Sequence, residues 1–159
     1  MPTIKNLYVI VARDVTTDAA DRMNSVIKVI DKFTFNVNRE QLSREGFKLG
    51  EQEIGLPANY AVATSWILEE KLKTDTFFNF KINIFDPDGE KLGTGPEQEN
   101  VVPAGIDRIN LNFNVQGMPV TKPGKYTLKA AIFSKSGKLL GEGTYPFEVE
   151  FTEVPNRPS

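Results

Sequence analysis

The segment Asp86-Pro87-Asp88-Gly89 carries the two carboxylates best suited to bind a metal ion. Calcium takes about six to eight oxygen ligands, so Asp86 and Asp88 would need the carboxylates of another loop, which holds Asp14, Asp18 and Asp21. The same segment also has ordinary turn chemistry, because aspartate side chains hydrogen-bond the turn backbone and glycine tolerates a positive φ. We favour the turn, and we expect no metal site and no other cofactor.

Asparagine is unusually frequent at positions that we predict to be the outward face of strands. Asparagine is depleted in strands, where threonine or lysine is the ordinary solvent-facing choice. A face of amides could bind a sugar, pair with another subunit or form a ladder across strands. A neutral, solvated face is the plainer alternative. The candidate binding residues of this kind are Asn79, Asn83, Asn110, Asn112 and Asn114.

Four large apolar residues also fall on the outward phase of the predicted strands, namely Ile67, Phe77, Phe85 and Phe133. If they converge, they form a patch of the kind that marks protein association. The alternative is that a helix or a long loop covers them as a second small core. Trp66, by contrast, is expected to lie in the core between sheets.

Missing residue types exclude several enzyme classes. The 159 residues contain no histidine and no cysteine, which rules out imidazole bases, Ser-His pairs, thiol nucleophiles and thiolate metal sites. Gly93-Thr94-Gly95 and Ser136-Gly137-Lys138 lack the residues that complete a dinucleotide loop or a P-loop. We therefore predict that the protein is not an enzyme, and a hydrolase that works without histidine is the less favoured alternative.

Charge and hydropathy argue against nucleic-acid and membrane partners. The net charge is −2, and no basic run is present. The apolar stretch Leu7–Ala12 has six residues, which is shorter than the seven or so of a signal peptide and the ~20 of a membrane span. A chain without cysteine suits a reducing compartment, so we expect a cytoplasmic protein.

The dominant period of the apolar residues is two, which is the period of a strand. Alternating sets recur along the chain, for example Ile109, Leu111, Phe113 and Val115 against the intervening asparagines. Turn sequences such as Lys122-Pro123-Gly124-Lys125 separate these sets. About eight such strands predict an all-β fold, an immunoglobulin-like two-sheet antiparallel β-sandwich.

One segment departs from the strand pattern. Asn38 is a plausible N-cap, Gln41 stands three residues later, and Gly46 follows the segment 39–45. We expect one short helix there, in a connection that crosses between the sheets. The stretches 47–56 and 93–105 are expected to be loops. We predict a single domain over residues 1–153 and a frayed tail over 154–159.

The order of these segments resembles a family of small, functionally uncharacterised bacterial proteins that are predicted β-sandwiches. An apolar first strand is followed by Ser25-Val-Ile-Lys-Val-Ile-Asp-Lys-Phe33, later by Phe85-Asp-Pro-Asp-Gly89 and finally by Pro123-Gly-Lys-Tyr126. The chain departs from the family at Lys28, where glycine is usual, and at Lys32, which stands between Asp31 and Phe33. The resemblance implies the sandwich fold and a bacterial source, and it carries no catalytic residues.

Taken together, the sequence predicts a non-catalytic protein-binding or assembly module that acts through sheet faces or edge strands. Its partner would be another protein or a second copy of the chain. The alternative is a sandwich that binds a carbohydrate or another small molecule on its asparagine face.

Overall fold

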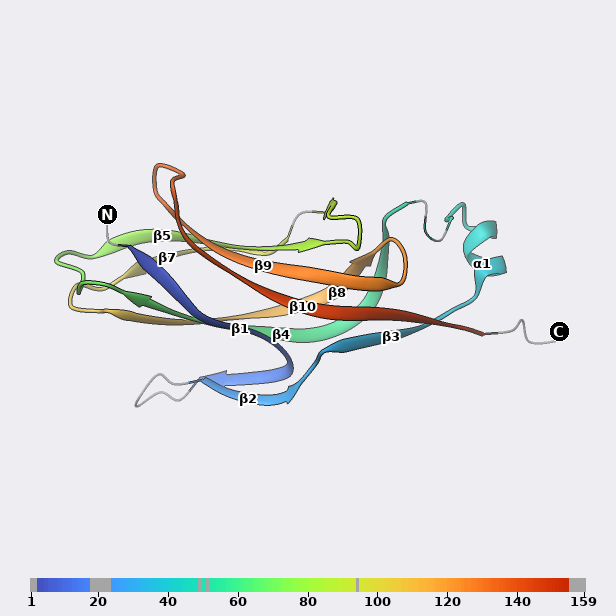
Figure 1. The fold of residues 1–159 in the computed structure, drawn as a ribbon, viewed down its shortest axis with the longest axis horizontal. Coiled ribbons are helices and arrows are strands. Elements are labelled where there is room, and N and C mark those ends of the chain that lie inside the picture. The colour runs from blue at the N-terminus through green and yellow to red at the C-terminus, as the bar shows by residue number, and fades with distance from the viewer. Residues whose placement is uncertain (1–2, 18–23, 49, 51, 94, 155–159) are drawn as a thin grey trace.

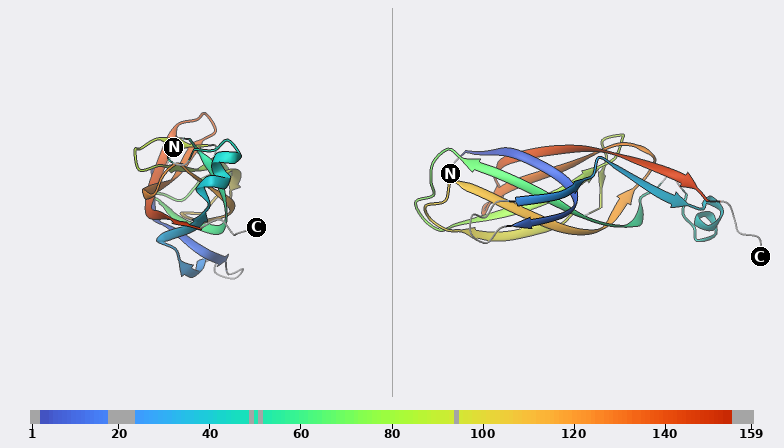
Figure 2. Two further views of the ribbon diagram at one scale, coloured as in Figure 1. Left: turned by 90° about the vertical axis from the view of Figure 1, so that its right-hand side faces the viewer. Right: turned by 90° about the horizontal axis from the view of Figure 1, so that it is seen from below.

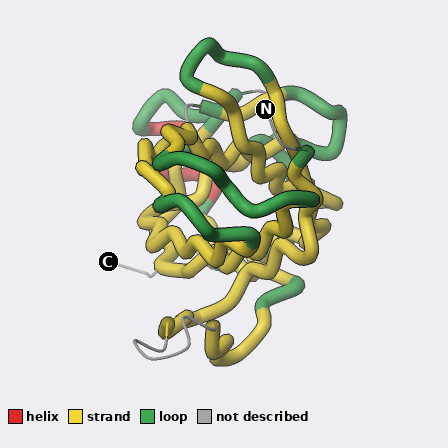
Figure 3. Tube along the Cα trace, turned by 90° about the vertical axis from the view of Figure 1, so that its left-hand side faces the viewer, coloured by secondary structure: helices red, strands yellow, loops and turns green. Residues whose placement is uncertain are grey.

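The computed structural model describes residues 3–17, 24–48, 50, 52–93 and 95–154. These residues form two β-sheets that pack face to face, with one short helix at an end of the sandwich (Figures 1 and 3). The expected all-β, two-sheet sandwich fold is thereby confirmed. Among the described residues, no helix is both long and apolar enough to cross a membrane.

Sheet A has four strands, all paired antiparallel. Its strands, in spatial order, are β2 (Asn24–Val29), β1 (Ile4–Thr17), β4 (Ile54–Leu68) and β8 (Arg108–Val120).

Sheet B has six strands, and β5 pairs with three of them. In spatial order they are β3 (Lys32–Val37), β10 (Leu139–Glu153), β9 (Gly124–Ser134), β5 (Thr76–Phe85) and β6 (Lys91–Leu92), with β7 (Glu97–Val102) also on β5. The pair β3–β10 is parallel, and the other pairs of this sheet are antiparallel.

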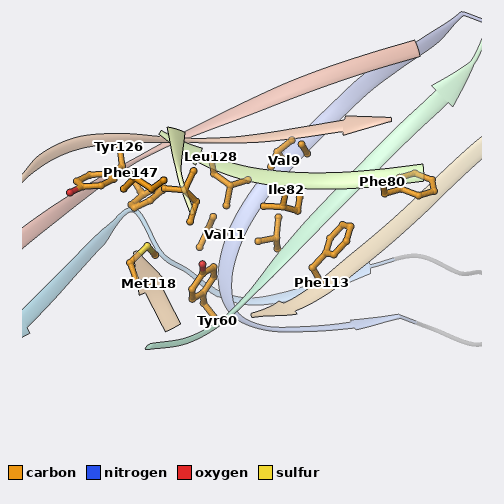
Figure 4. Close-up of a cluster of buried hydrophobic side chains, with 14 of the residues drawn as sticks. Val9, Val11, Tyr60, Phe80, Ile82, Phe113, Met118, Tyr126, Leu128 and Phe147 are labelled. Carbon is orange, nitrogen blue, oxygen red and sulfur yellow. The ribbon is translucent and has the colours of Figure 1, made fainter. Parts of the chain in front are cut away.

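The alternating apolar sets meet between the sheets, as the period-two pattern predicts. On β5, for example, Phe78, Phe80 and Ile82 are at most 2% exposed, whereas the residues between them are half-buried on the outer face. Figure 4 shows side chains of both sheets interdigitating. Trp66 is buried as expected, near the end of β4, and its Nε1 donates to Thr64 Oγ1 at 2.9 Å.

The predicted short helix is present as α1 (Arg39–Arg44). The side chain of Asn38 accepts a hydrogen bond from the Gln41 N–H at 2.9 Å, so Asn38 is the N-cap. α1 lies in the connection from β3 of sheet B to β4 of sheet A. It stands at the far end of the sandwich from the start of β5 (Figure 1).

The region after Ala12 differs from the loop that we expected. β1 bends there, and its second half forms a hairpin with β2 that folds back along the outer side of sheet A (Figures 1 and 2). Asn24 Nδ2 on β2 donates to the hydroxyl of Tyr8 on β1 at 2.9 Å. The outward-facing Ala61, Ala63 and Ser65 are fully buried, so the middle of β4 is buried on both faces.

The hairpin contains one strained backbone position. Lys28 has a φ of 53°, and it is the only non-glycine residue among those described with a positive φ. This is the position at which the resembled family carries glycine. A side chain in the left-handed region brings Cβ close to the following carbonyl, so the departure seen in the sequence has a structural cost.

Two of the expected loops contain strand residues, because β4 begins at Ile54 within the stretch 47–56 and β7 lies within the stretch 93–105. The segment 93–105, which we expected to be a loop, contains β7, because Glu97, Glu99 and their neighbours form a polar edge strand without an apolar period. The predicted frayed tail, 154–159, lies outside the described residues except for Val154, whose N–H donates to the Val37 carbonyl at 2.8 Å.

Candidate functional site

The five candidate asparagines lie on two opposite surfaces rather than on one. Asn79 and Asn83 alternate with the core residues of β5 and face outward from sheet B. The other three, Asn110, Asn112 and Asn114, face outward from sheet A, directly opposite Ser65, Ala63 and Ala61 of β4. Period two assigns a residue to a face of its own strand, but it does not say to which sheet that strand belongs.

The three sheet A asparagines differ in how far they are buried along β8. Asn114 is exposed, whereas Asn110 and Asn112 are half-buried. Asn110 Oδ1 accepts a hydrogen bond from the fully buried Ser65 Oγ at 2.6 Å. Two of the three amides therefore belong to a covered region, and the evenly solvated face that we considered as the plainer alternative is not what the structure shows.

The four outward apolar residues do not converge. Phe77 and Phe133 lie diagonally on neighbouring strands, since Phe133 pairs with Asn79. Phe85 lies at the other end of β5, where Lys129 Nζ stands 5.4 Å from its ring centre, and Ile67 lies on sheet A. Only Phe77 and Phe133 share a patch.

Two further exposed residues extend that patch. Val101 is 64% exposed opposite Phe77, and Leu139 is 46% exposed opposite Phe133. Lys81 Nζ lies 5.2 Å from the centre of the Phe133 ring, which gives the patch a charged border.

Asp86 is a turn residue. Its Oδ1 accepts from the N–H groups of Asp88 and Glu90, each at 2.9 Å, and its Oδ2 accepts from Thr121 Oγ1 at 3.0 Å. Burial raises the pKa of Asp86. These hydrogen bonds and the charge of Lys122 together outweigh the effect of burial, so the pKa lies below its usual value. Both carboxylate oxygens thus have a structural role.

Asp88 forms an ion pair with Lys122 instead of turning toward Asp86. Of the other aspartates considered for calcium, Asp18 and Asp21 lie outside the described residues. Within the described part of the chain, no group of three or more acidic side chains is placed to hold a metal ion.

The free edge of β8 is a feature that composition did not single out. Along its described length β8 pairs with β4 alone, so no described strand pairs with its other side. The stretch Ile109–Gln116 contains no charged residue, no proline and no glycine. A bulge with Gly117 at a φ of 84° ends it.

A hollow of about 510 Å³ lies between β8 of sheet A and the β5–β6 side of sheet B. We call it the intersheet hollow, and among the residues that line it are Glu53, Tyr60, Ile84, Leu92, Asn114 and Met118. Tyr60 is only 4% exposed and points its hydroxyl into the space between the sheets (Figure 4). Burial raises the pKa of Tyr60 to about 12, so the phenol is neutral at physiological pH. We did not predict this site, because its residues come from four separate segments.

Comparison with known proteins gives similarities of fold alone. No protein-family model matches the chain, and no curated protein matches it. Similar solved structures include a β-glucuronidase from Bacteroides uniformis, which is 17% identical over 60% of this chain, with a TM-score of 0.44. The match spans only 12% of the glucuronidase.

Two other structures match over nearly their whole length. An immunoglobulin-like protein from Pseudomonas aeruginosa is 14% identical, with 92% of this chain and 96% of that chain covered and a TM-score of 0.34. A Niemann-Pick type C2 protein from the Japanese carpenter ant is 8% identical, with 93% of each chain covered and a TM-score of 0.43. The resemblance to the uncharacterised bacterial family stays a prediction.

Proposed function

We propose that this protein is a non-catalytic assembly module that pairs with a second copy of itself along the free edge of β8. The observation that supports it is the uncharged, eight-residue stretch Ile109–Gln116 on an unpaired strand edge. Soluble proteins usually protect such an edge with charges, proline, bulges or short length, because a bare edge is a template for another strand.

The other edges of the sandwich are protected in these ways. β6 has two residues, and β2 is short and carries the strained Lys28. β7 carries Glu97 and Glu99, and β3 begins with Lys32 in an ion pair with Glu150. The first half of β1 is covered, because its Ile4 carbonyl lies so close to Gly141 of β10 that a Cβ there would come within 2.6 Å. β8 is the exception.

The sequence of the edge is self-complementary. If two copies pair antiparallel about a two-fold axis at Asn112, Asn110 of one copy lies opposite Asn114 of the other, and Asn112 lies opposite itself. The amides then form a continuous ladder on one face. On the other face Leu111, which is only half-buried in the single chain, meets Phe113 of the second copy. This register places no like charges opposite each other.

The test compares two single substitutions that introduce the same charge. In the proposed register Asn112→Asp sets two carboxylates directly opposite each other, whereas Asn114→Asp faces a neutral Asn110. Light scattering after size exclusion should give a dimer of the 17.8 kDa chain at micromolar concentration. We expect Asn112→Asp to weaken the dimer by about tenfold more than Asn114→Asp, and added salt to restore part of the loss.

A monomer at every concentration would refute the proposal. Equal effects of the two substitutions, with far-ultraviolet circular dichroism showing both to be folded, would refute the register about Asn112. Capture of an extended segment of a different protein along β8 would replace the second copy with a foreign partner.

A further inference from the structure

The intersheet hollow contains a polar group that the protein leaves unused. No described residue forms a hydrogen bond with the Tyr60 hydroxyl, and burial alone shifts its pKa. The ring itself is fixed, since it packs edge-to-face on Phe33 with centroids 5.4 Å apart. The hydroxyl oxygen is accessible from the hollow, since it is not among the fully buried side-chain atoms of the described residues that lack a partner. A bound molecule with a hydrogen-bonding group can therefore become its partner.

The remaining walls define what kind of molecule fits. Ile84, Leu92 and Met118 are buried apolar residues, and they line the hollow together with Val115. The volume of about 510 Å³ is in the range of sites that enclose drug-sized molecules, which are mostly apolar with a few placed polar groups.

Charge narrows the class of ligand. Among the described residues that line the hollow there is no lysine or arginine, and the ionised side chain at its rim is Glu53. The Glu53 carboxylate is held there by the Gly93 N–H, which donates to Oε2 at 3.2 Å. An anion would meet a carboxylate without a compensating cation, so the site disfavours negative charge.

The wall opposite β8 is closely fitted to the sheet. A Cβ at Gly95 would lie 1.5 Å from the Ile82 carbonyl oxygen, and the Ile82 N–H donates to the Pro96 carbonyl at 2.9 Å. The chain around Gly95 therefore lies directly against β5. A wall held by backbone contacts keeps the hollow open in the free protein and reduces the ordering needed on binding.

We propose that the intersheet hollow binds a small, mainly apolar ring compound that carries no negative charge and has a hydrogen-bonding amino or hydroxyl group facing Tyr60. The hollow shares Asn114, Val115 and Gln116 with the proposed pairing stretch of β8, so binding in the hollow and pairing along β8 need separate tests.

Two fluorescent probes with the same ring system test the proposal. N-Phenyl-1-naphthylamine is neutral and has one N–H that can donate to the Tyr60 oxygen, while 8-anilino-1-naphthalenesulfonate adds a negative charge. We expect the neutral probe to bind saturably, with one molecule per chain. The sulfonate should bind at least about tenfold more weakly, because no cation lines the hollow.

Matched tyrosine variants assign the binding to the hollow. Tyr60→Phe removes only the unused hydroxyl and should weaken the neutral probe by about threefold to tenfold. Tyr145→Phe is the control, since its hydroxyl donates to the Ile30 carbonyl at 2.8 Å, away from the hollow. Gly55→Phe should block binding, because Gly55 lines the hollow and a Cβ there has no neighbour within 4 Å.

Repeating the titrations in Asn112→Asp separates this site from the pairing along β8. Saturable binding that is lost in Gly55→Phe and weakened in Tyr60→Phe supports the proposal, whether or not the protein dimerises. Absence of saturable binding, equal affinity for the sulfonate, or equal effects of Tyr60→Phe and Tyr145→Phe would overturn it.

Discussion

Replacing Lys28 with glycine should make the protein more stable. Lys28 holds a φ of 53° on β2, a conformation that costs an L-residue roughly 1–2 kcal/mol and costs glycine almost nothing. Glycine also gains about 0.4–1 kcal/mol of conformational freedom in the unfolded chain, which opposes the gain. The net expectation is a stabilisation of about 0.5–1 kcal/mol.

Urea unfolding followed by tryptophan fluorescence measures this difference, since the single Trp66 is buried between the sheets. For a domain of this size the change corresponds to a rise in melting temperature of about 1–4 °C. Lys28→Ala is the matched control: it removes the same charged side chain and keeps Cβ, so it should differ little from the parent. If glycine is no better than alanine, the strain at this position does not exist in solution.

Three further changes test other parts of the structure. Tyr126→Phe removes a buried hydroxyl that donates to the Lys122 carbonyl at 2.6 Å and accepts from the Thr121 N–H at 3.0 Å. The free energy of unfolding, measured in urea, should fall by about 2 kcal/mol. A fall of less than ~0.5 kcal/mol would contradict these two hydrogen bonds. Asp86→Asn should flatten the acid side of the stability profile. Because folding lowers the pKa of Asp86, its contribution is complete above the unfolded value of about 3.9 and is lost as the pH falls through the folded value; an unchanged profile would count against this role. Asn110→Thr should lower the melting temperature more than Asn83→Thr, because Asn110 accepts a hydrogen bond from the fully buried Ser65. Equal melting temperatures of the two variants would contradict the burial of the outer face of sheet A at this position.

The strands could be predicted because successive side chains of a strand point to opposite faces, so the local sequence alone shows which residues are buried. The alternation on β5 and β8 and the N-cap at Asn38 all appear in the structure as their local patterns require. The same reasoning missed β7, whose polar sequence becomes a strand only because β5 offers it an edge. Tertiary pairing can thus override weak local preference.

The candidate sites were less predictable, because they depend on which strands become neighbours. Nothing in the pattern of β4 indicates that Ala63 and Ser65 are buried on the outer face, since the hairpin that reaches this side is distant in sequence. Likewise, Tyr60 has the phase of an ordinary core residue. Its unused hydroxyl becomes visible only when four segments meet around the intersheet hollow.

The parallel pairing of β3 with β10 has a consequence for the order in which the protein folds. The Tyr145 hydroxyl of β10 bonds the Ile30 carbonyl across 115 residues of sequence, and Phe33 and Phe147 pack edge-to-face beside it. During synthesis β3 emerges early and has no strand beside it until β10 leaves the ribosome. Proteins dominated by such distant contacts fold slowly, in milliseconds to seconds. We therefore expect the segment around Phe33 and Phe35 to stay open to premature association until β10 has been synthesised.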